Sequence, residues 1–78
     1  MNISLAINKG SKILKQNSIP NSHLDSEILM AKTINKDREY IFLNSNIKIN
    51  KKSLNYFYKL IKQRSIGNPV AHLTNKKF

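Results

Sequence analysis

The sequence predicts an all-α fold, a small bundle of about four to five short helices. Apolar residues recur at spacings of three and four along most of the chain, which is the period of an amphipathic helix. Residues that cap or stop helices separate these stretches. The chain has 78 residues and no cysteine, so one thin hydrophobic core has to stabilise it without disulfides.

The first helix is expected from about residue 2 to 17. The residues that share its apolar stripe are Ile3, Ala6, Ile7, Gly10, Ile13 and Leu14. Pro20 follows the helix; it lacks a backbone donor and biases Ile19 away from helical angles. The segment around Pro20 is therefore predicted to be a loop between helices.

A second helix is indicated by Ser22 and by Asp25 three residues later. The pair forms a shortened capping box, in which each side chain accepts from a free backbone amide of the other. The apolar stripe comprises Leu24, Ile28, Ala31 and Ile34, widened by Leu29 and Met30. We expect this helix to be the most buried. The polar run 35–37 ends it.

Asp37 is expected to cap a short third helix, from Arg38 to about Leu43, which carries Tyr40 and Ile41.

A fourth helix is expected from about residue 51 to 66. Asn50 can cap it, and Ile49 can pack on Leu54 as a hydrophobic staple. Its apolar stripe comprises Leu54, Phe57, Tyr58 and Ile61, broadened by Leu60.

Gly67 is expected to end the fourth helix in a left-handed conformation, and Pro69 prevents the helix from resuming. The remaining tail is expected to form a short helical turn and then an extended segment that leads through Phe78. We therefore assign residues 1–67 to a helical domain and residues 68–78 to the start of a linker.

Net charge is the strongest compositional signal, with 14 Lys and Arg against 4 Asp and Glu, a formal +10. Such a field attracts phosphate backbones or an acidic protein surface. The chain is also rich in Asn and Ile, whose codons, like those of Lys, are rich in A and T, so drift in base composition is an equal explanation. Lys48, Lys51 and Lys52 are the candidate partner-binding residues, because the dipole at the start of a helix disfavours each positive charge by about 0.3 kcal/mol or more.

Aromatic residues among lysines in the fourth helix raise the alternative of a free-standing nucleic-acid-binding module. Helical phase places Phe57 and Tyr58 on the apolar stripe and leaves Tyr56 on the basic side. Core packing is therefore favoured over base stacking. A third possibility is a purely structural helical cap.

No residue of this chain is expected to be catalytic, cofactor-binding or metal-binding. Asp25 and Glu27 are two apart on a helix and point in different directions, so Asp25 is interpreted as a cap and Glu27 as exposed or ion-paired. His23 is expected on the surface and His72 in linker packing, since neither has a ligand partner at helical spacing.

Two segments resemble the N-terminal domain of the HemK/PrmC family of peptide chain release factor glutamine methyltransferases. Residues 24–31, Leu-Asp-Ser-Glu-Ile-Leu-Met-Ala, resemble the family's Leu-Asp-Ala-Glu-Leu-Leu-Leu-Ala, and residues 35–38 resemble its Gly-Lys-Asp-Arg. Arg64 and residues 67–74 are similar to its Arg-x-x-Gly-Glu-Pro-Val-Ala-Tyr-Leu-Thr. The chain departs from the family at Gln63, His72, Asn75 and Lys77.

The resemblance implies the substrate-recruiting front domain of an S-adenosylmethionine-dependent enzyme that methylates the glutamine of a Gly-Gly-Gln motif. The family's Asn-Pro-Pro-Tyr signature and glycine-rich cofactor loop belong to a methyltransferase domain that would follow Phe78. Asn68 and Pro69 precede valine and do not match that signature. The expected partner is a release factor, and the expected state is a cytoplasmic monomer. No apolar run approaches the roughly 20 residues of a membrane-spanning helix.

Overall fold

The computed structural model describes residues 1–74, and this part of the chain forms five α-helices and no strand. The helices are α1 (Ile3–Gln16), α2 (Ser22–Ile34), α3 (Arg38–Leu43), α4 (Lys51–Ser65) and α5 (Val70–Thr74). The all-α prediction is confirmed, and the expected boundaries of α1, α3 and α4 agree with these bounds to within one residue. Phe78 and the expected extended segment lie outside the described residues.

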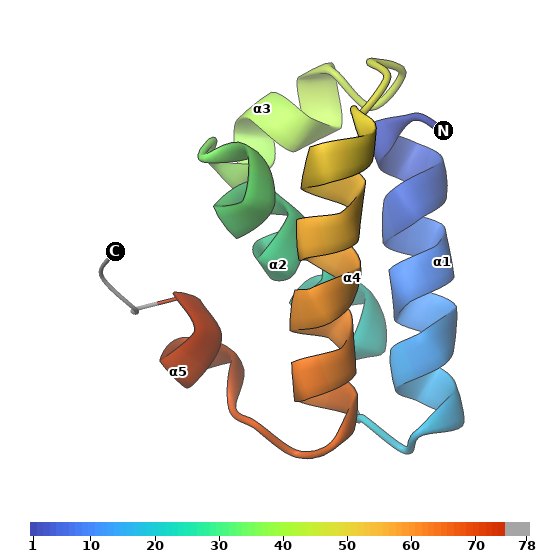
Figure 1. Cartoon of the computed structure of the whole chain (residues 1–78), viewed down its shortest axis with the longest axis vertical. Coiled ribbons are helices and arrows are strands. Elements are labelled where there is room, and N and C mark those ends of the chain that lie inside the picture. Colours follow the sequence, from blue (N-terminus) through green and yellow to red (C-terminus); the bar gives the residue numbers. More distant parts are fainter. Residues whose placement is uncertain (75–78) are drawn as a thin grey trace.

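Helices α1 and α4 run alongside α2, α3 crosses one end of the bundle, and α5 lies toward the other end (Figure 1). Helix α2 contacts each of the other four helices. The largest fully buried apolar side chains, which come from α1, α2 and α4, are Phe57, Leu14, Leu29, Met30 and Ile61. None of the helices in the described range is both long enough and apolar enough to cross a membrane.

The apolar stripe of α1 is buried as expected, and Asn2 caps the helix by accepting a hydrogen bond from the Leu5 amide at 2.8 Å. Gly10 lies where α1 meets both α2 and α4. A Cβ atom at Gly10 would lie 2.7 Å from the Ser26 Oγ, 2.8 Å from the Ile61 Cδ1 and 2.9 Å from the Phe57 Cζ. The absence of a side chain therefore lets three helices approach closely.

The predicted phase of α2 is wrong in part: Leu29 and Met30 are buried as expected, but the centre of the buried face is shifted from Leu24 and Ile28 to Asp25 and Ser26. Its buried residues are Asp25, Ser26, Leu29 and Met30, whereas Leu24 is 40% exposed. The polar residues tolerate burial because each has a partner; the Ser26 hydroxyl, for example, donates to the Ile7 carbonyl at 2.7 Å. Only His23 and Leu24 are exposed along α2, but α2 has four buried residues against five in α1, so by that measure α2 is not the most buried helix, contrary to the prediction.

The Ser22–Asp25 capping box is also wrong. Asn21 occupies the N-cap position without a side-chain hydrogen bond, and Ser22 is already the first helical residue. The other two predicted caps are confirmed: Asp37 accepts from the Tyr40 amide and Asn50 from the Ser53 amide, both at 2.8 Å.

Gly67 ends α4 as predicted, with a φ of 106°. Helix α5 then packs against α2 and α4, and Leu73 lies against the buried core. Ile49 and Leu54, the predicted staple residues, both pack on the same core. The division between a helical domain ending at residue 67 and a linker beginning at residue 68 stays a prediction.

Candidate functional site

The connection between α3 and α4 is held against the start of α1 by backbone hydrogen bonds. The Ile3 amide donates to the Ile47 carbonyl and the Ile49 amide to the Met1 carbonyl, each at 3.0 Å. Asn2 and Lys48 form an isolated antiparallel bridge between these bonds. The backbone at Lys48 is therefore fixed by the bundle and does not belong to a freely hanging loop.

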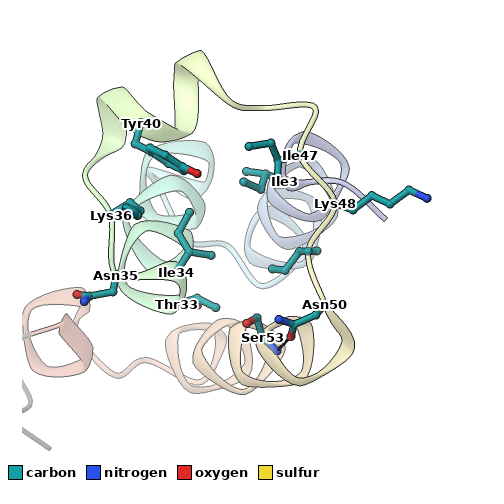
Figure 2. A pocket seen from close by; sticks show the side chains of 11 residues that line it. Ile3, Thr33, Ile34, Asn35, Lys36, Tyr40, Ile47, Lys48, Asn50 and Ser53 are labelled. Atoms are coloured by element: carbon teal, nitrogen blue, oxygen red, sulfur yellow. Dashed lines mark hydrogen bonds between the residues drawn. The ribbon is translucent and has the colours of Figure 1, made fainter.

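This connection forms one wall of a hollow of about 330 Å³ at the end of the bundle (Figure 2). Residues of α1, α2, α3 and α4 line it. The turn between α2 and α3 and the connection between α3 and α4 complete the lining. The lining residues are Ile3, Thr33, Ile34, Asn35, Lys36, Tyr40, Ile47, Lys48, Ile49, Asn50 and Ser53. Figure 2 shows Tyr40 reaching toward the hollow from α3, with Ile3 and Ile47 on the side opposite, while the Lys48 side chain extends outward from the rim.

The rim of the hollow is positively charged, and its walls are about equally apolar and polar. Lys36 and Lys48 both contribute to the lining, and no acidic residue does. The Lys36 Nζ lies 5.2 Å from the centroid of the Tyr40 ring, which is within the range of a cation–π contact. The arrangement can accept a negatively charged group at the rim and an apolar group inside.

All three lysines proposed from the sequence lie at this end of the molecule, and all three are exposed. Lys48 lines the hollow, whereas Lys51 and Lys52 occupy the first turn of α4 outside its lining. Lys36 and Tyr40 were not predicted from the sequence. A lysine in the turn before a short helix and a tyrosine on that helix form a weak signal, and only the fold brings both to the hollow that Lys48 lines.

The three adjacent aromatics of α4 are arranged for packing. Phe57 is fully buried, and its ring centroid lies 5.7 Å from that of Tyr58. Burial raises the pKa of Tyr58 above its ordinary value of 10.0, because desolvation disfavours the phenolate. Tyr56, expected on the basic side, is also partly buried against the core. The aromatics of α4 therefore do not form the exposed stacking platform on which the nucleic-acid interpretation of this helix depends.

The remaining titratable candidates form ion pairs or lie on the surface. Glu27 is ion-paired as expected, with the Arg38 Nη2 at 2.9 Å and the His23 Nε2 at 3.5 Å. His23 is exposed, as expected. His72 on α5 is exposed as well, so in the described residues it does not pack as expected.

Asp25 corrects the sequence interpretation, because it is a buried ion-pair partner and not a cap. Its Oδ2 accepts from the Arg64 Nε at 2.9 Å, and the two side chains are only 10% and 20% exposed. Arg64 also donates to the Asn68 carbonyl at 3.3 Å.

The described residues thus form a small all-α bundle with a hollow that lysines border and isoleucines line in part. The chain belongs to the PrmC N-terminal domain family, whose model matches residues 6–74. The resemblance inferred from residues 24–38 and 64–74 is thereby confirmed.

Characterised relatives support the same membership. The chain is 32% identical over 71 residues to a release factor glutamine methyltransferase of Leptospira interrogans, covering 91% of this chain and 25% of that protein. It is 31% identical over 77 residues to one of Buchnera aphidicola, covering 99% and 27%. A bifunctional methyltransferase of Rickettsia felis is 31% identical over 75 residues, covering 96% and 14%. The chain thus spans about a quarter of the length of the first two. No solved structure matches it.

Proposed function

We propose that this chain is the release-factor-recruiting domain of an S-adenosylmethionine-dependent methyltransferase that modifies the glutamine of the Gly-Gly-Gln motif. The observation that carries the proposal is the family match over residues 6–74. The relatives that share these residues are named as methyltransferases of release factors. The proposal includes a cytoplasmic location, because peptide release takes place on cytoplasmic ribosomes.

Methyl transfer is assigned to a domain outside the described residues. Gly10 lies inside α1 and Gly67 ends α4, so neither belongs to a glycine-rich loop that follows a strand. The residues of this bundle therefore do not fit the S-adenosylmethionine cofactor. The contribution of this domain to the reaction would be to bind the protein substrate.

Lys48, Lys51 and Lys52 are the proposed contact residues for the release factor. They are exposed and lie within five residues of one another at the start of α4. Positive charge on such a face would attract an acidic protein surface and raise the association rate more than the affinity.

The test is the binding of release factor to this chain at several salt concentrations, measured by surface plasmon resonance. We expect the Lys48→Gln, Lys51→Gln, Lys52→Gln triple variant to associate about tenfold more slowly at low salt. The matched control carries Lys9→Gln, Lys12→Gln and Lys15→Gln on the exposed side of α1, which removes the same charge from another face.

If the association rate with release factor fell equally in the two triple variants, a specific role for the α4 lysines would be contradicted. If the unaltered chain does not bind release factor even at low salt, recruitment is wrong and the structural-cap alternative is favoured. Tight binding of tRNA at 150 mM salt without binding of release factor would favour the nucleic-acid alternative.

A further inference from the structure

We propose that the hollow at the end of the bundle is a receptor for an acidic peptide segment that carries one large apolar side chain. The apolar side chain enters between the isoleucines, and flanking carboxylates meet Lys36 and Lys48. The inference rests on the proposed function only in assigning this peptide segment to the release factor.

The walls of the hollow are held by interactions that do not require a ligand. Backbone bonds tie the connection before α4 to the start of α1, and Asn50 caps α4 at the rim. Asn35 ends α2 in a left-handed conformation, with a φ of 57°, and Asp37 then caps α3 so that Tyr40 is placed over the opening. A preformed site of this kind loses little conformational entropy when a ligand binds.

The size and walls of the hollow fit an apolar side chain. A cavity of roughly 150 Å³ in a protein core holds benzene, so about 330 Å³ leaves room for an aromatic or branched side chain and part of its backbone. Four isoleucines line the hollow, Ile3, Ile34, Ile47 and Ile49; Ile3 is only 2% exposed, so the accessible apolar area comes from the other three. Ile47 is 45% exposed, so part of this area faces solvent in the free protein.

Charge complementarity selects an acidic occupant. Lys36 and Lys48 are the charged residues of the lining, and both are exposed. Of the nearby acids, Asp37 caps α3 and Glu27 pairs with Arg38, while Glu39 is exposed on α3 outside the lining. A carboxylate at the rim would therefore meet lysines that no acid of the lining neutralises.

A peptide fits these features better than a nucleic acid does. A phosphate backbone would satisfy the lysines but would leave the isoleucine walls without an apolar partner. Helix α3 also exposes Phe42 by 81% and Leu43 by 70%, but neither lines the hollow, and Phe42, two residues after Tyr40, lies on another side of the helix. A partner with both carboxylates and an apolar side chain can use the lysines and the isoleucines of the hollow.

The experiment follows amide resonances of the ¹⁵N-labelled chain during titration with the capped peptide Glu-Glu-Phe-Glu-Glu. We expect shifts concentrated at residues that line the hollow, and at least about fivefold weaker binding by the Lys36→Gln, Lys48→Gln variant. The Lys9→Gln, Lys12→Gln control should bind as the unaltered chain does. The peptides Glu-Glu-Gly-Glu-Glu and Lys-Lys-Phe-Lys-Lys test the apolar and the acidic requirement separately, and both should bind more weakly.

Two results would overturn the inference: shifts centred on the α1 lysines, or a Gly-containing peptide that binds as tightly as the Phe-containing one. Tighter binding of oligouridylate than of peptide at the hollow would also overturn it. Competition with release factor separates this inference from the proposed function. If release factor binds this chain but the peptide does not displace it, the assignment of the hollow fails and the recruitment proposal stands. If the peptide binds at the hollow but release factor does not bind, the recruitment proposal fails. The assignment of the peptide segment to the release factor then fails with it.

Discussion

Gly10 is the position at which a single methyl group would disturb three helices. Alanine would improve the helix propensity of α1 by about 1 kcal/mol. Its Cβ would, however, meet atoms of Ser26, Ile61 and Phe57 at 2.7 to 2.9 Å, and overpacking of this kind costs about 1–3 kcal/mol. We therefore expect Gly10→Ala to lower the free energy of unfolding by up to about 2 kcal/mol, measured by urea denaturation.

Ser26 provides the control for this prediction. Ser26→Ala removes the oxygen that lies closest to the new Cβ atom, so Gly10→Ala should cost less in that background than alone. If the double variant lost as much stability as the two single variants together, the Ser26 contact would not be the source of the strain. A net gain in stability from Gly10→Ala would contradict the packing argument altogether.

Individual residues also show why part of the core escaped prediction. The sequence pattern identified the buried apolar residues of α1, because they follow the helical period without interruption. It failed on α2, where the buried face contains Asp25 and Ser26. Their partners, Arg64 and the Ile7 carbonyl, lie far away in the sequence, so no local rule could assign these polar side chains to the interior.

At the scale of elements, Arg64 joins α2, α4 and the turn that leads into α5. Its Nε pairs with Asp25, and it also donates to the Asn68 carbonyl. Breaking a buried ion pair by removing one partner leaves an uncompensated charge and costs about 3–5 kcal/mol when burial is complete. This pair retains some exposure, 20% for the arginine, so the expected cost is smaller.

We expect Arg64→Met, which keeps the apolar stem, to lower the free energy of unfolding by about 2 kcal/mol. Amide exchange in α5 should accelerate more than in α1, because the turn before α5 loses its anchor. The control is Arg38→Met, which breaks the exposed Glu27–Arg38 pair and should cost less than about 0.5 kcal/mol. Unchanged exchange in α5 would show that its packing on α2 alone holds it in place.

The elements themselves were predictable where caps mark their ends. Asp37, Asn50 and Gly67 act as the sequence indicates, and the bounds of α3 and α4 follow from them. The start of α2 was not predictable from the sequence. Ser22 and Asp25 match a capping pattern, but Asp25 pairs with Arg64 instead. A tertiary ion pair has replaced the local interaction.

On the scale of the whole molecule, charge repulsion acts across the entire domain. A net charge of +10 is held within principal extents of 29 × 28 × 22 Å. At 10 mM salt the screening length is about 30 Å, and at 150 mM it is about 8 Å. Repulsion between opposite faces is therefore felt at the lower concentration and largely screened at the higher.

We expect the melting temperature to rise by about 3–6 °C between 10 and 150 mM NaCl, as measured by circular dichroism. The Lys9→Gln, Lys12→Gln, Lys15→Gln variant should melt higher at 10 mM and respond less to salt. A melting temperature that falls with salt would mean that attraction within ion pairs outweighs the repulsion.

The site shows the limit of sequence reasoning at this scale. Lys48, Lys51 and Lys52 could be selected because they stand at a helix start that disfavours positive charge. The hollow could not be predicted, since its lining comes from four helices and a connection that only the packed bundle brings together.

The pairing of the first residues with the connection before α4 has a practical consequence for anyone preparing this protein. The Met1 carbonyl and the Ile3 amide are both bonded to that connection, and the Tyr58 hydroxyl donates to the Met1 sulfur at 3.5 Å. An affinity tag fused ahead of Met1 would emerge beside Lys48, where its bulk would obstruct the candidate site. A tag placed there is expected to weaken release-factor binding by itself, so binding assays should use tag-free protein.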